Sequence, residues 1–342
     1  MDTPHPAPGL PASYTPQMSA AIARSTAAIA RLDARISESP AAPAWQRRAM
    51  WSGYAEALRL QGHEIDENGV FSHLYEVRIG DRPLRTTVID LFEALPDWEA
   101  ALRAPDSFAW KDALPIAVGG PPSDIADHPA LMRALDQVQR HARHVPTPTP
   151  WLGLPFALRD HQLTAHPLPC LAGGAKAFRF RRTLPEPEWL ALLRRLEKDA
   201  LDGLERLNSL EATYKAAQRA IVAEYRPGRL PALLALVQHR PLLSPQGVAD
   251  MLGLSVGGAS KLLERGVSAG LLVEINARRS WRQFLARDLA EAYGFVDPRR
   301  GRPRKEPPPL PPSRDIASVL DAFDQEIAEI DRLLDRLVPQ AQ

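Results

Sequence analysis

A chain of 342 residues, 45% of them apolar, is long enough for two or three domains with cores of their own. It lacks the run of about 18 apolar residues that a membrane-spanning helix needs. Its first residues show no basic and apolar leader of the secretory kind. The single cysteine, Cys170, excludes an internal disulfide and a cysteine-rich zinc site. We therefore expect a cytoplasmic protein that does not enter a membrane.

The net charge of +1 is distributed unevenly along the chain. Residues 226–305 contain 14 Lys or Arg and six Asp or Glu, a net charge of +8, so the rest of the chain carries −7. A nearly neutral protein with one basic region predicts nucleic-acid binding that is confined to that region.

The first residues, 1–16, are rich in proline and predict a disordered tail, followed by a helical domain over residues 17–150. Met18–Ser37 has a thin apolar stripe at helical spacing, which indicates a packing helix or a dimer seam. Trp45–Gln61 is a second expected helix. Its Arg47 and Arg48 lie outside the apolar face, where solvent or a phosphate group would meet them.

The rest of this domain has weaker patterns. Val70–Ile79 mixes β-branched and aromatic residues and predicts a short strand. Thr86–Arg103 predicts one helix interrupted at Pro96 or two helices, and residues 104–130 are expected to be irregular. A further helix is expected over Leu131–His144.

Residues 151–225 are predicted to be a connector and a long helix. A Pro-rich connector covers residues 145–155, and FRFRRT at 178–183 alternates in the manner of an edge strand. Its Arg179, Arg181 and Arg182 would face solvent, or contact DNA or an acidic ligand. Pro187–Tyr225 has the longest helical pattern and would span roughly 55 Å. That length favours a lever or a dimerisation helix, with residues 226–231 as the hinge.

Residues 226–295 predict a small domain of helices and a β-hairpin. After a first helix over Leu233–His239, Ser244 is an N-cap for one short helix, Gly253 ends it, and Ser255 caps the next. Gly270 ends that second helix. Strands are then expected over Leu271–Ile275 and Trp281–Leu285, joined by a loop at 276–280.

This pattern, SxxxxSxLLxxxxxxGLL with its turn glycine, resembles a winged helix-turn-helix domain over Arg229–Asp288. More widely, the chain resembles a family of uncharacterised bacterial proteins in which a domain of unknown function precedes a helix-turn-helix domain. The resemblance implies double-stranded DNA as a partner, with the second helix, residues 255–267, in the major groove. Bases or phosphates would meet its exposed N-terminal residues, which are Ser255, Val256, Gly257, Gly258, Ser260 and Lys261. The two glycines permit close backbone approach or leave the helix frayed. In the wing at 278–282, phosphate or minor-groove contacts would come from Arg278, Arg279 and Arg282.

A basic, Pro-rich linker is expected over residues 296–313. Within it, PRRGRPRK at 298–305 resembles an AT-hook, because glycine lets the backbone enter a narrow minor groove while proline keeps the chain extended. The alternative is a plain basic linker. The residues expected to contact DNA are Arg300, Gly301, Arg302, Pro303 and Arg304.

Residues 314–342 close the chain with an acidic amphipathic helix. Ile316, Phe323, Ile330 and Leu337 recur every seven residues. This stripe would pair with its copy in a dimer or dock within the chain, and three heptads favour docking.

The sequence contains no nucleophile elbow, phosphate loop, zinc-protease motif or dinucleotide fingerprint. His128, His141 and His144 lack an evident further metal ligand. The helical front half followed by a winged domain loosely resembles Fic-type adenylyltransferases, but His128-Pro129 and His166-Pro167 lack the rest of their phosphate loop. We therefore expect a non-enzyme without a cofactor or metal.

The predicted fold is mainly α, with minor β in the N-terminal region and the hairpin. The favoured hypothesis is a dimeric transcriptional regulator that binds DNA, with a front half that assembles the dimer or senses an unidentified small-molecule effector. The alternatives are a DNA-tethered scaffold or partition-type protein, and an enzyme of unrecognised type in the front half.

Overall fold

A computed structural model describes residues 10, 11, 13–79, 90–106, 108–114, 125–181, 183–276 and 282–297, together with 322, 325 and 327–329. It is mainly helical, as predicted, with a small antiparallel sheet of three strands. Two compact units are distinguished, Met1–Val296 and Asp297–Gln342. The helices and strands that carry the argument all belong to the first unit.

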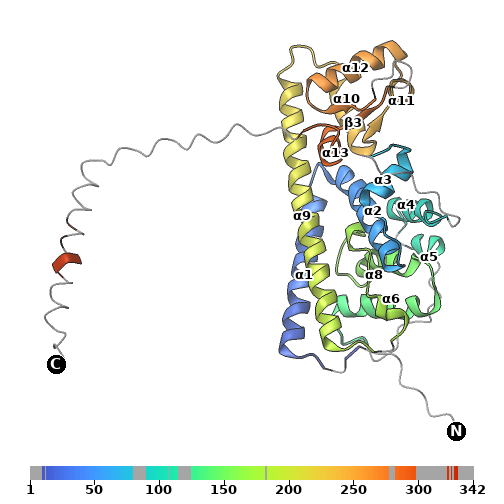
Figure 1. Cartoon of the computed structure of the whole chain (residues 1–342), viewed down its shortest axis with the longest axis vertical. Helices are drawn as coiled ribbons and strands as arrows, with labels where there is room; N and C mark the ends of the chain where they lie inside the picture. Colours follow the sequence, from blue (N-terminus) through green and yellow to red (C-terminus); the bar gives the residue numbers. More distant parts are fainter. Residues whose placement is uncertain are drawn as a thin grey trace, which may run out of the picture. The chain divides into compact units, whose positions relative to one another are not determined.

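Two long helices form one side of this unit, α1 (Pro16–Ser37) and α9 (Glu186–Val222). They run parallel and side by side (Figure 1), and polar contacts join them at intervals along α1. The buried Ser25 hydroxyl, for example, donates to the carbonyl of Leu193 at 2.8 Å. The prediction of a long helix is therefore confirmed. From Glu186 to Glu211 this helix runs along α1, and it buries Trp189, Leu193, Leu196 and Leu207 within the unit.

The core of the front half is built around α2 (Ala42–Leu60). Around it lie α3 (Glu67–Tyr75), α4 (Leu95–Arg103), α5 (Trp110–Ala113), α6 (Ala130–His144), α7 (Thr149–Leu152), α8 (Leu154–Asp160) and two 3₁₀ turns, η2 (Pro169–Leu171) and η3 (Lys176–Arg179). At Gly53, a Cβ atom would lie 2.0 Å from the Pro169 carbonyl oxygen, so only glycine lets η2 approach α2 this closely. Large aromatic side chains fill the core, including the fully buried Trp45, Trp51, Trp98, Trp110, Trp151 and Trp189.

Two predicted strands are wrong. Val70–Ile79 begins within α3, because the Asp66 side chain caps that helix at the Gly69 amide and places Val70 and Phe71 on its buried side. The FRFRRT segment contains the end of η3. Its alternation arises from a turn that buries Phe178 and leaves Phe180 85% exposed.

The described residues of three segments that are expected to be irregular include helices or buried side chains. The connector at 145–155 contains α7 and the start of α8, so the domain boundary expected after residue 150 falls inside a helix whose Trp151 is fully buried. Residues 104–130 include α5. In the expected tail, Leu10 is buried, the Tyr14 hydroxyl lies 2.6 Å from Nδ1 of His128, and Thr15 caps α1.

The C-terminal part of the first unit contains four helices and the sheet. They are α10 (Leu230–His239), β1 (Leu242–Leu243), α11 (Pro245–Leu252), α12 (Val256–Ser268), β2 (Leu272–Glu274), β3 (Phe284–Ala286) and α13 (Arg287–Ala292). The strand order is β1-β3-β2, with Leu285 opposite both Leu242 and Val273. Both expected hairpin strands are present, the first shortened to Leu272–Glu274 and the second shortened and shifted by one residue to Phe284–Ala286. At Gly266 on α12, a Cβ atom would lie 2.8 Å from a methyl group of Leu233, so α10 and α12 pack closely there.

This part also packs against the front half. The face of α2 that was expected in solvent instead buries Arg48, which is 3% exposed and bonded to Asp288 on α13. Arg47 bonds Glu99 on α4. The Arg48 guanidinium is therefore not available to phosphate in this structure, whereas the Arg47 side chain stays 19% exposed.

In the described part of the chain, no helix is both long enough and apolar enough to cross a membrane. Of the C-terminal helix expected over 314–342, the described residues 322, 325 and 327–329 are helical.

Candidate nucleic-acid interface

The pair α11 and α12 is fixed by signals that the sequence shows directly. The Ser244 hydroxyl accepts from the Gly247 amide at 3.1 Å, and the Ser255 hydroxyl accepts from the Gly258 amide at 3.1 Å. Gly253 has a φ of +62°, the left-handed conformation that ends α11. The caps and the turn predicted at these three residues are confirmed. Arg229 adds a bond from its guanidinium to the Leu252 carbonyl at 3.0 Å, which holds the turn against the start of α10.

One face of α12 is buried and the other meets solvent. Ala259, Leu262, Leu263 and Gly266 face the core. Near the start of the helix, the solvent face carries Ser255, Val256, Gly257 and Lys261, with Gly258 and Ser260 at its edges. The structure thus brings together the six residues predicted to contact DNA from this helix. In Figure 1, α12 lies at one end of the long axis of the first unit.

The two glycines of this helix differ in their surroundings. A Cβ atom at Gly257 would meet open space, whereas one at Gly258 would lie 3.2 Å from the capping oxygen of Ser255. Packing within the chain therefore gives no reason for a glycine at position 257. It leaves the backbone there open to a close approach from outside.

Arg282 is placed differently from the prediction of a wing-tip contact. Its Nε and one terminal nitrogen donate to the two carboxylate oxygens of Glu274 on β2, at 2.7 and 2.8 Å. Its other terminal nitrogen donates to Glu264 on α12 at 2.7 Å. The bonds to Glu274 and Glu264 raise the pKa of the guanidinium, and Arg282 in turn lowers the pKa of Glu274. Arg282 therefore ties the hairpin to α12 at its base.

The other basic residues expected to contact DNA lie outside the described residues. They are Arg278 and Arg279 in the hairpin loop, and Arg300, Arg302 and Arg304, with Gly301 and Pro303, in the AT-hook-like segment.

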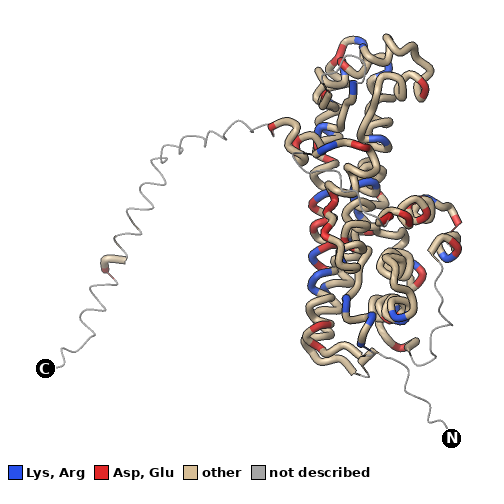
Figure 2. Tube along the Cα trace, turned by 45° about the vertical axis from the view of Figure 1, so that its right-hand side comes forward, with Lys and Arg blue, Asp and Glu red and all other residues tan. Residues whose placement is uncertain are grey.

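Three of the described cations in residues 226–297 are ion-paired. Besides Arg282, Arg265 bonds Glu224 and the Arg226 carbonyl, and Arg287 bonds Glu291. Among the described residues of this range, the exposed side chains that make no ion pair are those of Arg226, Arg229, Arg240 and Lys261. Figure 2 shows acidic and basic residues interspersed over this end of the unit. Arg240 was not anticipated, because a lone arginine between a helix and a proline carries no motif.

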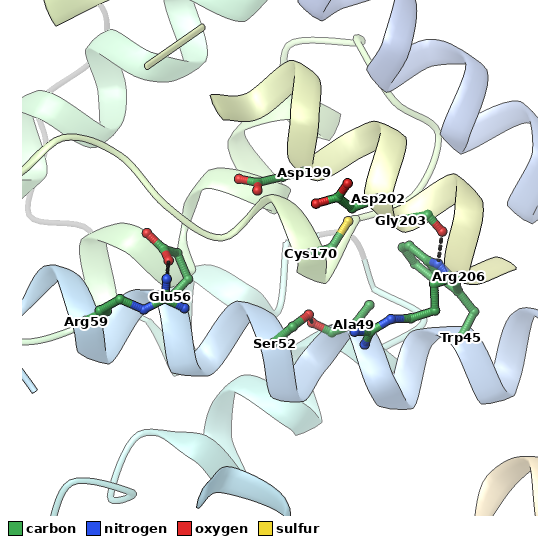
Figure 3. A pocket seen from close by; sticks show the side chains of 10 residues that line it. All are labelled: Trp45, Ala49, Ser52, Glu56, Arg59, Cys170, Asp199, Asp202, Gly203 and Arg206. Atoms are coloured by element: carbon green, nitrogen blue, oxygen red, sulfur yellow. Dashed lines mark hydrogen bonds and ion pairs between the residues drawn. The ribbon is translucent and has the colours of Figure 1, made fainter. Parts of the chain in front are cut away.

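A second feature, unpredicted from the sequence, is a polar cavity of about 200 Å³ between α2, η2 and α9 (Figure 3). Asp199 and Asp202 on α9 face Glu56 on α2, with the Cys170 thiol between the helices. Burial raises the pKa of Asp199 to about 6 and also raises the pKa of Cys170. These residues come from three distant segments, so no spacing in the sequence relates them. Among the described residues, no group of three or more His, Cys, Asp or Glu side chains is arranged to hold a metal ion.

No protein-family model matches this chain, and no curated protein matches it.

Proposed function

We propose that residues 229–288 form a winged helix-turn-helix domain and that the protein binds double-stranded DNA as a cytoplasmic transcriptional regulator. Support comes from the order of the elements, in which α10, β1, α11 and α12 are followed by the β2–β3 hairpin. The observation that carries the proposal is the capped N-terminal face of α12, which is exposed and supported from behind by α10 and α11.

In this proposal α12 is the recognition helix. Its first amide groups and the positive end of its dipole favour a phosphate or a polar base edge. Ser260 and Lys261 would contact bases or phosphates, and the open position at Gly257 would let the backbone come close to the duplex. Arg278 and Arg279 in the wing would contact phosphate or the minor groove, and the hook around Arg300–Pro303 would enter an A·T-rich minor groove.

A regulator of this class reads a two-fold site as a dimer, with recognition helices about 34 Å apart along the DNA. The amphipathic C-terminal segment, with its seven-residue apolar repeat, is the proposed source of self-association or of docking within the chain. The front half would then sense an effector or support assembly rather than catalyse a reaction.

A second candidate is a DNA-tethered scaffold that binds without sequence preference. One observation favours it. Arg265 and Arg282, on and beside α12, are paired with carboxylates, whereas residues 299–305 contain five Lys or Arg within seven positions. In that case the hook would supply most of the affinity, and binding would follow salt concentration steeply.

Retention of fragmented genomic DNA by the full chain, followed by sequencing, separates the two candidates. The variants are Lys261→Ala with Arg278→Ala and Arg279→Ala, and separately Arg300→Ala with Arg302→Ala. Enrichment of one short two-fold site, lost in the first variant, is the result expected of a regulator. If the chain retains A·T-rich DNA and only the second variant loses it, the result supports the DNA-tethered scaffold instead of the regulator. If the chain retains no DNA at all, both candidates are wrong.

A further inference from the structure

A cavity of about 420 Å³ opens where the front half meets the C-terminal helices. Its walls include Arg47 and Met50 on α2, Glu99, Leu102 and Arg103 on α4, and His239 at the end of α10. This volume is within the range of about 300 to 1,000 Å³ that small-molecule sites occupy.

The described side chains that line this cavity include more arginines than carboxylates. Arg47 and Arg103 both donate to the same carboxylate oxygen, Oε1 of Glu99. One carboxylate thus serves two guanidiniums. Among the described side chains that line the cavity, one positive charge remains without a counter-charge. The side chain of Arg47 is 19% exposed, so water screens its charge less than at an open surface.

Apolar side chains line the cavity together with these charges. Met50, on α2 with Arg47, is buried, and Leu102, on α4 with Glu99 and Arg103, is half-buried. A surplus cation together with apolar side chains suits a molecule that has a negative head and an apolar body. A cationic or neutral molecule of the same shape would leave the surplus charge unpaired.

We propose that this cavity binds a small organic carboxylate. Its head lies between Arg47 and Arg103, in partial competition with Glu99, and its body lies against Met50 and Leu102.

The position of His239 adds a consequence that rests on the proposed DNA-binding function. His239 is the last residue of α10, and α10 packs on α12 at Leu233 and Gly266. A ligand held between α2, α4 and His239 contacts both the front half and the support of the recognition helix. If the ligand shifts the end of α10, occupancy of the cavity changes DNA affinity, and DNA then changes the affinity for the ligand by the same factor.

The test uses benzoate, benzamide and benzylammonium, three probes of nearly one shape that differ in charge. Binding to the full chain is measured without DNA by titration calorimetry, at matched ionic strength. Benzoate is expected to bind and the other two are not. Arg103→Gln, at an exposed position that places folding at little risk, weakens benzoate binding roughly tenfold, as expected for a lost charge-assisted hydrogen bond.

Glu99→Gln should change benzoate affinity in the opposite direction, because it removes the competing carboxylate while keeping the shape of the side chain. We expect this variant to bind benzoate roughly tenfold more tightly. Arg24→Gln is the matched control, since Arg24 is also ion-paired but lies on α1 beside Glu197. It leaves benzoate binding unchanged.

Equal binding of benzoate and benzamide, no benzoate binding at millimolar concentration, or benzoate binding that is unchanged in both Arg103→Gln and Glu99→Gln would overturn the proposal. The effect on DNA is measured separately, as the change in DNA affinity when benzoate is added to wild type and to Arg103→Gln. Because the calorimetry contains no DNA, a failure of the DNA-binding proposal leaves the carboxylate site tested on its own.

Discussion

The guanidinium of Arg48 donates to both carboxylate oxygens of Asp288, at 2.7 and 2.9 Å, and so joins α2 to α13 across 240 positions of the chain. A third bond from Arg48 reaches the Ala44 carbonyl at 3.1 Å. The rings of Phe71 and Tyr293 pack beside this pair with their centroids 4.9 Å apart. The expected hinge at residues 226–231 is also held, because Arg265 bonds the Arg226 carbonyl. The Arg48–Asp288 pair therefore packs α13 directly on the front half, and the Arg265 bond fixes α12 to the segment that leads out of α9.

Loss of the buried arginine of this pair is expected to destabilise the whole first unit. Arg48→Met leaves the Asp288 carboxylate, whose side chain is 21% exposed, without its guanidinium and should lower the free energy of unfolding by about 1 to 3 kcal/mol. Urea denaturation measures the change. Arg24→Met removes the exposed pair with Glu197 and should cost under about 1 kcal/mol. A similar loss of unfolding free energy in Arg48→Met and Arg24→Met would show that the Arg48–Asp288 pair does not stabilise the contact between the two halves.

The N-cap of α12 has a stability contribution that is separable from DNA contact. Ser255→Ala removes the acceptor of the Gly258 amide and should cost about 1 kcal/mol. Ser255→Asn, which can still cap, should stay within a few tenths of a kcal/mol of wild type. Thermal denaturation followed by circular dichroism checks both. If Ser255→Ala is as stable as wild type, the Ser255 cap does not set the start of this helix.

Arg282 and Lys261 are expected to act differently although both are basic residues beside α12. Arg282→Ala frees Glu264 and Glu274 and should lower stability by under about 1 kcal/mol, since the pairs are at the surface. Lys261→Ala should leave stability unchanged and should reduce the slope of log affinity against log salt by about 0.9 for one lost phosphate contact. Fluorescence anisotropy over a salt series gives the slopes. The reverse assignment, in which Arg282→Ala changes the slope and Lys261→Ala does not, would contradict these two roles.

Asp199 predicts a pH dependence of stability. Burial raises its pKa from the ordinary 3.8 to about 6, so the folded state binds more protons than the unfolded state between these values. Stability from this group is therefore present at low pH and is lost as pH rises through about 6. Asp199→Asn, which mimics the protonated side chain, should stabilise the protein at pH above 6 by at most about 3 kcal/mol.

That gain should vanish as the pH falls toward the ordinary pKa of aspartate. Denaturation midpoints of Asp199→Asn and wild type across this pH range test the sign. Asp202→Asn is the control, because Asp202 lies in the same cavity with its side chain 56% exposed. A constant difference between Asp199→Asn and wild type at every pH would mean that the pKa of Asp199 is not raised.

The features of the fold that could be predicted from the sequence are those set by local signals. Ser244, Gly253 and Ser255 act on amides or dihedral angles within about three residues, so their roles follow from position alone. The strand predicted over Val70–Ile79 is wrong because its β-branched and aromatic residues favour a strand, whereas the Asp66 cap and the burial of Val70 and Phe71 produce a helix.

The candidate site was also predictable only where local signals determine it. The exposed face of α12 follows from helical periodicity, but the ion pairs of Arg282 depend on Glu274 and Glu264 in two other elements. A weak signal for one of them existed, since Glu274 pairs with Phe284 in the sheet and an arginine two residues away lies diagonally across the hairpin. The Arg48–Asp288 pair and the two cavities had none, because their residues meet only after α2, α4, α9 and α13 have packed.

The proposed function depends on contact between the N-terminal face of α12 and DNA, and Gly257 offers the sharpest test of that contact. The position is exposed and a Cβ atom there meets open space, so Gly257→Glu and Gly257→Ala should both fold. Alanine should stabilise the helix by up to about 1 kcal/mol, and glutamate in the first turn should also be favourable by about 0.3 to 1 kcal/mol.

The two variants should differ in their affinity for the genomic fragments that wild type retains. Gly257→Glu places a negative charge where phosphate is expected and should abolish retention, while Gly257→Ala should keep at least part of it. If Gly257→Glu folds and retains the same fragments as wild type, α12 does not contact the duplex and its proposed role as the recognition helix is wrong.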